Sequence, residues 1–429
     1  MSRRTASAGP QQDRDCSVVF SLLTITVWQI DKRKLCGYAT TNFPNAGLLS
    51  GISEVHLKAI VTGSGGLVGS ACARFFAEQG WQVIGLDNNM RQEFFGPQGS
   101  TSSEVVNLRQ TVPGYRHYSF DIRDRQKIRD LLRSERPAMV IHTAAQPSHD
   151  KASAIPYDDF DINAVGTLNL LVAARDYCPE SPICFTSTNK VYGDRPNTIP
   201  LRELDTRFDY ADGRDGIDES MSIDSSLHSL FGVSKASADL LCQEFGRYYN
   251  MPTGIFRCGC LTGPHHAAVE LHGYLAYIVL CAVRGKPYSI YGYQGKQVRD
   301  QIHCSDVASL FLEFYKSPRP GEVFNLGGGR ANSISIVETI AALGDMGFDL
   351  EYQMFEQNRI GDHICYISDI SKVRACYPGW EMQYDLPRIL SEMAARYCAA
   401  ETRSATKGRL RRRRRSGSDR LAPPVPESL

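Results

Sequence analysis

Short apolar runs alternate with longer segments of helical periodicity over most of the chain. The alternation starts with the apolar run Ala59–Thr62, and such runs of about four to eight residues are typical of buried strands. The segment after it repeats apolar residues at helical spacing, at Val68, Cys72, Phe75 and Phe76. This alternation predicts a doubly wound α/β domain, in which helices cover a parallel sheet.

The same pattern continues along the chain and then changes. Further strands are predicted at Gln82–Asp87, Arg116–Asp121, Ala138–His142, Pro182–Ser187, Met251–Arg257 and Tyr288–Tyr291, and helices at Arg123–Arg133, Asp159–Arg175, from near His228 to Tyr249, and Glu270–Arg284. Gln92–Pro113, which contains glycine and serine, reads as an insertion. We therefore expect a Rossmann-like domain and a smaller mixed α/β lobe.

The chain divides into four parts on this pattern. We expect an N-terminal extension over 1–55, a dinucleotide-binding domain over 56–258 with a return segment near 300–326, a substrate-binding lobe over 259–299 and 327–398, and a disordered basic, proline-rich tail over 399–429. The apolar run Val18–Ile30 is shorter than the ~20 residues of a membrane helix. Asp31-Lys-Arg-Lys follows this run, where a signal peptide needs small residues. The run therefore fits neither a membrane helix nor a signal peptide.

Composition narrows the function classes only slightly. The 48 Lys+Arg and 47 Asp+Glu of the 429 residues give a net charge of +1, so no specific nucleic acid or membrane partner is indicated. The 13 cysteines are scattered without a Cys-x-x-Cys pair, which predicts reduced thiols in a cytoplasmic protein. His265 and His266 lack a third ligand at suitable spacing, so we expect no metal site.

A glycine turn carries the first chemical signal. Gly63, Gly66 and Gly69 separate the first strand from its helix, and glycines there let a pyrophosphate approach the backbone at a helix N-terminus. Asp87 ends the second strand 18 residues beyond Gly69, where a carboxylate accepts both ribose hydroxyls. The acid favours NAD over NADP, although Arg91 nearby could bind the 2′-phosphate of NADP, so NADP remains an alternative.

Polar and small residues follow the later strands at the edge where ligands bind. Ala144 is small enough for a flat ring to lie against the strand end, and Thr188 to Asp194 is a polar run after the fifth strand. Asn163, on the first turns of its helix, reads from spacing alone as a buried residue that bonds the backbone.

The chain resembles the extended short-chain dehydrogenases/reductases, the NAD-dependent epimerases and dehydratases of nucleotide sugars. The resemblance covers about Leu57 to Tyr397 and rests on the glycine turn, Asp87, Asp121-Ile122, the helix with Asn163, Ser187-Thr188, Lys235, Arg299-Asp300-Gln-Ile-His303 and Asn325-Leu-Gly-Gly-Gly329. Ser187-Thr-Asn-Lys-Val-Tyr-Gly-Asp194, with Asp362 after Arg359-Ile-Gly, looks most like the CDP-paratose (CDP-tyvelose) 2-epimerases.

The resemblance implies roles for individual residues, a nucleotide-diphospho-sugar (a CDP-sugar in first place) as substrate, and a homo-oligomer, dimer or tetramer. Cofactor contacts would come from Gly63, Gly66, Gly69, Asp87, Asp121, Ile122, Ala144, Asn163 and Lys235; substrate contacts from Asn189, Arg257, Arg299 and Arg359; and catalytic groups from Thr188, Lys235 and Tyr192.

Two positions bear on the reaction. Dehydratases of this family carry an Asp-Glu pair after the strand-end threonine, whereas Asn189 and Lys190 stand there in this chain, which disfavours dehydration. Epimerisation asks only that a hydride and a proton leave and return. The family's base is the tyrosine of a Tyr-x-x-x-Lys pattern, but the chain has Phe231 four residues before Lys235.

The missing phenol leaves three hypotheses open. In the first, another residue replaces it as the base: Thr188, Tyr192, His228 or Lys235. In the second, Phe231 packs on the nicotinamide of a protein that binds NAD without turnover. In the third, the protein is a simple NAD-dependent dehydrogenase that releases the ketone. We expect an epimerase, with Lys235 on the cofactor ribose and the base unassigned.

Overall fold

The computed structural model describes residues 57–266, 269, 273–358 and 362–418. The N-terminal extension expected over 1–55 lies outside these residues. In the described part of the chain, no helix is long and apolar enough to cross a membrane.

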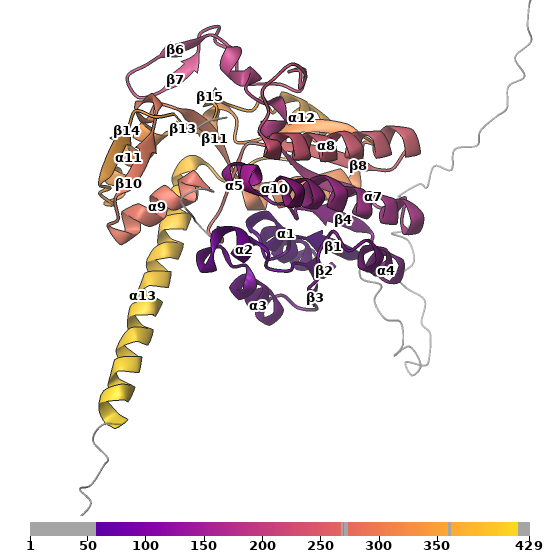
Figure 1. Cartoon of the computed structure of the whole chain (residues 1–429), viewed down its shortest axis with the longest axis horizontal. Helices are drawn as coiled ribbons and strands as arrows, with labels where there is room; N and C mark the ends of the chain where they lie inside the picture. Colours follow the sequence, from indigo (N-terminus) through magenta and orange to yellow (C-terminus); the bar gives the residue numbers. More distant parts are fainter. Residues whose placement is uncertain (1–56, 267–268, 270–272, 359–361, 419–429) are drawn as a thin grey trace, which may run out of the picture. The chain divides into compact units, whose positions relative to one another are not determined.

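A seven-stranded parallel sheet forms the centre of the described structure (Figure 1). Across the sheet the strands are β12 (Glu322–Leu326), β8 (Thr253–Cys258), β5 (Ile183–Thr188), β4 (Met139–His142), β1 (Lys58–Thr62), β2 (Gln82–Leu86) and β3 (Arg116–Tyr118). The chain moves outward from β1 to β3 and then returns past β1 to β4, so the strand order reverses between β1 and β4. This confirms the predicted doubly wound sheet, and the reversal is where such sheets open a ligand crevice.

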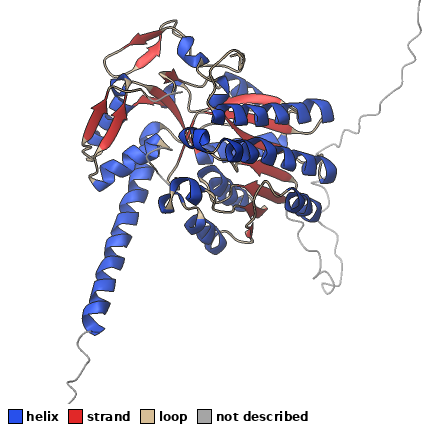
Figure 2. Ribbon diagram, viewed as in Figure 1, coloured by secondary structure: helices blue, strands red, loops and turns tan. Residues whose placement is uncertain are grey.

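Helices cover both faces of the sheet, as Figure 2 shows by its red strands between blue helices. Successive residues of β1 point to opposite faces: Ala59 and Val61 pack with one group of helices and Ile60 with the other. The first group is α1 (Leu67–Glu78), α10 (Cys304–Lys316) and α12 (Ser371–Cys376), and the second is α4 (Arg125–Glu135), α7 (Gly166–Tyr177) and α8 (Leu230–Tyr249). Strands buried on both sides explain why the apolar runs are nearly continuous.

Two predicted segments differ in detail from the structure. The expected insertion after β2 contains helices α2 (Arg91–Phe95) and α3 (Ser102–Thr111), and α3 buries Val105 and Leu108 although its sequence is mostly polar. The helix expected over Asp159–Arg175 is α6 (Pro156–Phe160), a π-helical turn η3 (Asp161–Val165) and α7 in succession. Wide turns of this kind are set by tertiary contacts, which periodicity does not report.

The smaller lobe is built around β11 (Val298–His303). It pairs with β9 (Cys260–Thr262), β13 (Ser333–Ser335) and β15 (Cys365–Tyr366), while β10 (Tyr288–Tyr291) pairs separately with β14 (Tyr352–Phe355). The remaining elements are the short helices α5 (His149–Ala154), η2 (Pro97–Gly99), η4 (Asn189–Tyr192), η5 (Arg195–Thr198), η6 (Tyr293–Gly295) and η7 (Arg330–Asn332), the hairpin β6 (Leu201–Glu203) and β7 (Phe208–Tyr210), and helices α9 (Tyr274–Arg284) and α11 (Ile336–Asp345). Only residue 259 separates β8 from β9, so the lobe begins directly at the sheet's binding edge.

The last helix of the described structure extends into the predicted basic tail. Helix α13 (Leu386–Ser418) continues through residues for which we predicted disorder, and residues 419–429 lie outside the described part.

Candidate active site

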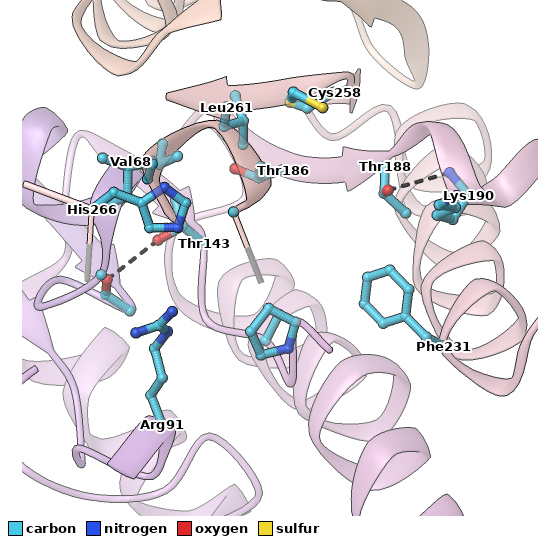
Figure 3. A pocket seen from close by; sticks show the side chains of 18 of the residues that line it. Val68, Arg91, Thr143, Thr186, Thr188, Lys190, Phe231, Cys258, Leu261 and His266 are labelled. Carbon is cyan, nitrogen blue, oxygen red and sulfur yellow. Dashed lines mark hydrogen bonds between the residues drawn. The ribbon is translucent and has the colours of Figure 1, made fainter. Parts of the chain in front are cut away.

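One cavity of about 490 Å³ runs along the binding edge of the sheet and into the lobe. Its walls come from the ends of β1, β2, β4 and β5 on one side and from β9, α9, β10 and β11 on the other. Figure 3 shows Thr188, Lys190 and Phe231 toward one end of the view and Arg91 and His266 toward the other. The predicted cofactor and substrate regions therefore belong to a single space.

The glycine turn at the end of β1 leaves no room for side chains. Gly63 has φ +70°, and a Cβ at Gly69 would lie 2.1 Å from the carbonyl oxygen of Gly63. Gly66 caps the N-terminus of α1 without a side-chain hydrogen bond, and Gly63, Gly66 and Leu67 line the cavity. A bare helix N-terminus against the cavity is suited to an anionic group such as a pyrophosphate.

Asp87 stands at the cavity wall beside this turn. Its Oδ2 accepts a hydrogen bond from the Gly65 backbone N–H at 3.0 Å, and its Oδ1 accepts from the Thr101 hydroxyl at 2.9 Å. Those bonds fix the carboxylate where an adenosine ribose would lie. Arg91 also lines this end, but its guanidinium donates to the Gly99 carbonyl at 3.2 Å. Burial lowers the pKa of Arg91 to about 10, opposed by the charge of Asp87.

Lys235 lies under the floor of the cavity at the end of β5. Its ammonium donates to the Thr186 carbonyl at 2.8 Å and lies 4.2 Å from the centroid of the Phe185 ring. The residue is 4% exposed, and burial lowers its pKa to about 8. The neighbouring Thr186 hydroxyl is buried without a hydrogen-bond partner in the described structure. This end of the cavity therefore offers a donor and an unused hydroxyl to a ligand.

Phe231, Thr188 and Asn189 line the cavity near Lys235. Phe231 is on the first turn of α8, four residues before Lys235, and is 8% exposed. Ser229 caps that turn by accepting from the Gly232 N–H at 3.0 Å, which holds the Phe231 backbone in the helix. The ring contributes apolar surface here and no titratable group.

A cluster of charges closes the lobe side of the cavity. Arg299 donates to Asp362 Oδ1 at 2.5 Å and to the His363 carbonyl, and the ammonium of Lys190 lies 3.6 Å from the same Asp362 oxygen. Burial raises the pKa of Asp362, but the charges of Arg299 and Lys190 outweigh it and hold that pKa well below its usual range. With Lys190 protonated, the cluster carries one more positive than negative charge, and Arg299 alone already offers a guanidinium suited to a phosphate-bearing ligand.

Several predicted site residues lie away from the cavity wall. Tyr192 is fully buried, where its hydroxyl donates to Asn325 and accepts from Arg257, and Arg257 in turn pairs with Asp239. Neither Tyr192 nor Arg257 contributes to the cavity lining. Arg257 is near the end of β8 and points toward Asp239 of α8, whereas Tyr192 follows β5 and packs with buried residues of the lobe such as Tyr210 and Tyr366.

Other predicted contacts have mixed placements. Asn163 is buried and bonds the backbone of Gln146 through both its oxygen and its nitrogen, as its position suggested, and it does not line the cavity. Asp121, Ile122 and Ala144 do line it. Arg359 lies outside the described residues.

Sequence reasoning missed parts of the wall. Thr101 lines the cofactor side, and on the lobe side Gln301 donates to the Tyr274 hydroxyl at 2.6 Å. The alternation Gln297-Val-Arg-Asp-Gln301 could have revealed the wall, because only every second residue of a strand shares a face.

The geometry fits one class of protein. A doubly wound sheet, a glycine turn at a helix start and an acid after the second strand define a dinucleotide-binding α/β protein. The cysteines of the described part form no disulfide with one another. Within the described residues no cluster of His, Cys, Asp or Glu could hold a metal ion.

Comparison with known proteins specifies the family. The NAD dependent epimerase/dehydratase family matches residues 59–327. A CDP-paratose 2-epimerase of Salmonella typhi is 32% identical over 325 residues, which cover 74% of this chain and 92% of that protein. A dTDP-glucose 4,6-dehydratase of Escherichia coli is 28% identical over 356 residues, which cover 76% and 90%. The chain therefore belongs to the NAD-dependent epimerase/dehydratase family.

The fold agrees with solved structures. The UDP-glucose 4-epimerase of Thermus thermophilus, in complex with NAD, superposes with a TM-score of 0.65 at 23% identity and covers 80% of this chain and 99% of that chain. The predicted cofactor, NAD, is the one that the family description names. The residues present fit NAD, because the turn consists of glycines, and the absence of side chains there leaves space for a pyrophosphate.

Proposed function

We propose that the protein is an NAD-dependent epimerase of a nucleotide-diphospho-sugar, acting through a transient keto sugar, with a CDP-sugar as the favoured substrate. The observation that carries this proposal is the single cavity that joins the glycine turn to the Arg299–Asp362–Lys190 cluster. A cofactor and a phosphate-bearing substrate would meet in it at the end of β5. The preference for CDP rests on the similarity to the CDP-paratose 2-epimerase.

The cofactor half of the cavity offers each kind of contact that NAD needs. Gly63, Gly66 and the start of α1 would hold the pyrophosphate, Asp87 the adenosine ribose, and Lys235 the nicotinamide ribose. NAD supplies a carbon that accepts a hydride from the sugar and gives it back. Ile122 and Ala144 would lie against its flat rings as apolar surface.

The substrate half would bind the sugar nucleotide by charge. Arg299 is 8% exposed and fixed by Asp362, so its guanidinium is oriented before a diphosphate arrives. Asn189 and Thr188 line the cavity at the end of β5 and offer polar groups to the sugar hydroxyls. Since Asn189 and Lys190 replace an acid pair, elimination of water is disfavoured relative to epimerisation.

A second candidate function follows from Phe231. A buried phenylalanine in the cavity wall offers no proton, and loss of a general base typically costs ~10²- to 10⁴-fold in rate. A protein with this site and no replacement base would bind NAD and the nucleotide sugar with little or no turnover.

The test is incubation of the purified chain and NAD with CDP-, UDP- and GDP-hexoses. Formation of an epimer without net NADH supports the proposal, and stoichiometric NADH with release of a ketone indicates a dehydrogenase instead. Tight NAD binding without any product supports the second candidate. Under that candidate, Phe231→Tyr creates turnover where the parent has none.

A matched pair of variants checks the cofactor half. Asp87→Ala removes the ribose acceptor and is expected to weaken NAD binding about tenfold or more, measured by isothermal titration calorimetry. Asp212→Ala, an exposed control on the lobe outside the cavity, is expected to bind NAD like the parent. Equal NAD affinity for Asp87→Ala and the parent contradicts the proposed orientation of the cofactor.

A further inference from the structure

The first turn of α8 lacks a titratable group at Phe231, but a second element brings an amine to the same cavity. Lys190 is in η4, directly after β5, and lines the cavity together with Phe231. Its backbone N–H donates to the Thr188 hydroxyl at 3.2 Å. A Cβ added at Gly232 would lie 2.9 Å from the Lys190 carbonyl oxygen, so Lys190 lies against the helical turn that carries Phe231 (Figure 3).

The two lysines of the cavity have different surroundings. The ammonium of Lys235 is held at 2.8 Å by the Thr186 carbonyl, on the side of the sheet. The ammonium of Lys190 lies on the lobe side, beside Asp362, where the proposed function puts the substrate. Of the two amines, Lys190 is therefore the one that shares the substrate's side of the cavity.

Charges from several elements act on Lys190. Asp362 lies 3.6 Å away, Arg299 on β11 binds the same carboxylate, and Cys260 on β9 and His363 beside Asp362 also face the amine. Burial lowers the pKa of Lys190, Asp362 raises it, and Arg299 lowers it, with a net decrease. A larger fraction of the amine is therefore neutral near neutral pH than for an ordinary lysine.

We propose that Lys190 is the catalytic acid–base residue, in place of the phenol that Phe231 lacks; this inference rests on the proposed epimerase function. Neutral Lys190 Nζ removes the proton from a sugar hydroxyl while the same carbon gives its hydride to NAD. The O–H and C–H bonds break, a C=O and an N–H bond form, and the cofactor gains the two electrons. The keto sugar then rotates in the site and presents the opposite face of its carbonyl carbon. The hydride returns to that face, and Lys190 returns the proton to the carbonyl oxygen.

The first test measures the amine itself in the cofactor-free protein. Brief acetylation with acetic anhydride across a pH series, followed by peptide mass spectrometry, reports the fraction of each lysine that is neutral. We expect Lys190 to reach half-maximal reactivity at a lower pH than the exposed Lys286. A midpoint for Lys190 equal to or above that of Lys286 overturns the inference, whether or not the protein turns over any sugar.

The second test separates proton transfer from charge. Lys190→Arg keeps a cation beside Asp362, but a guanidinium stays protonated, so turnover is expected to fall about 10²- to 10⁴-fold. KM for the nucleotide sugar is expected to change by less than about threefold. Lys296→Arg is the matched control, because Lys296 pairs with Glu203 and does not line the cavity, and it is expected to turn over like the parent.

A phenol supplied at position 231 gives the sharpest readout. Phe231→Tyr in the Lys190→Arg background is expected to restore turnover at least about tenfold over Lys190→Arg alone. If Lys190→Arg keeps the parent's turnover, the inference fails while the epimerase proposal stands. If the parent forms no epimer from any of the sugars, the proposed function fails, and the acetylation midpoint still decides whether Lys190 is a tuned amine.

Discussion

At the scale of single residues, burial determines the charge state of Lys235. The amine is 4% exposed and bonds a backbone carbonyl, and burial lowers its pKa to about 8. An unfolded chain titrates its lysines near about pH 10.4. Between these values the unfolded state binds more protons than the folded state, so this group's contribution to the free energy of unfolding increases as the pH rises.

This difference predicts a pH-dependent stability. Between about pH 8 and about pH 10, Lys235 is expected to increase the parent's free energy of unfolding by about 1 kcal/mol per pH unit, relative to Lys235→Met. Urea unfolding of both proteins across this range measures it. Lys286→Met, at an exposed position, is the control and is expected to follow the parent. Parallel curves for the parent and Lys235→Met contradict the prediction.

Single residues also differ in how well the sequence predicts them. The placement of Gly63, Gly66 and Asp87 at the cavity was predictable because it depends on the local backbone at a strand end. Tyr192 and Arg257 are also near strand ends, but tertiary contacts set where each side chain points: Arg257 pairs with Asp239 of α8, and Tyr192 packs with residues of the lobe. Lys190 and Asp362 are far apart in the sequence, so their contact could not be predicted from the spacing of residues.

At the scale of elements, the contact between β1 and α1 positions the cofactor end of the cavity. Helix α1 starts at Leu67 and passes so close to the turn that a Cβ at Gly69 would overlap the Gly63 carbonyl. The obstacle is backbone, which moves only if the helix moves.

Gly69→Ala therefore tests this contact. We expect it to destabilise the fold by about 2 kcal/mol or more and to weaken NAD binding, because α1 must shift away from the turn. Thermal unfolding and calorimetric titration with NAD measure the two effects. Gly344→Ala, in α11 with open space around its Cβ, is the control and is expected to be neutral or up to about 1 kcal/mol stabilising. A Gly69→Ala protein that binds NAD like the parent refutes the argument.

Helix α11 begins with a capping box that ties the lobe together. Ser335 accepts from the Glu338 N–H at 3.0 Å, Glu338 accepts from the Ser335 N–H at 3.0 Å, and Arg207 next to β7 pairs with Glu338 at 2.5 Å. Ser335 also donates to the Thr206 carbonyl at 2.7 Å. One side chain thus serves a helix start and a neighbouring turn.

Ser335→Ala is expected to destabilise the protein by about 1–2 kcal/mol, because it removes the cap and the bond to Thr206. Urea unfolding measures the loss. Ser237→Ala, on α8 and bonded to the Val233 carbonyl of its own helix, is the control and is expected to change stability by less than about 0.5 kcal/mol. Equal stability losses for the two variants count against a special role of the cap.

Elements were easier to predict than residues. The strands of the main sheet are nearly continuous apolar runs, because both of their faces are buried, and six of the seven were predicted within a few residues. The sequence analysis did not predict β12 as a strand. Helix α3 was missed because only Val105 and Leu108 carry its buried face, and the turn η3 because its contacts with α8 are tertiary.

At the scale of the whole molecule, helices α6 and α8 carry large apolar side chains that are exposed to solvent. Tyr157 and Phe160 on α6 are 86% and 42% exposed, and Val233 and Leu240 on α8 are 42% and 50% exposed. Val233 and Leu240 lie seven residues apart, which places them on the same side of α8, and α6 packs against α8. We expect a second copy of the chain to cover this surface, in a dimer or tetramer.

Sedimentation velocity at micromolar concentration checks this expectation. The parent is expected to sediment as a dimer or tetramer, and Leu240→Glu to shift toward the monomer, because a charge would be buried at the contact. Val106→Glu, on α3 and equally exposed, is expected to sediment like the parent. A monomeric parent, or an oligomer that Leu240→Glu leaves intact, contradicts the expected interface.

The order of strands also has a consequence for synthesis on the ribosome. The chain leaves the main sheet after β8 and returns to it only with β12, after β9, α9, β10, β11 and α10. Until Glu322–Leu326 has left the exit tunnel, β8 is an open edge with unpaired backbone groups. The ribosome therefore synthesises about sixty further residues, those of the lobe strands and α10, at about 5–20 residues per second while that edge is exposed to chaperones and to neighbouring chains.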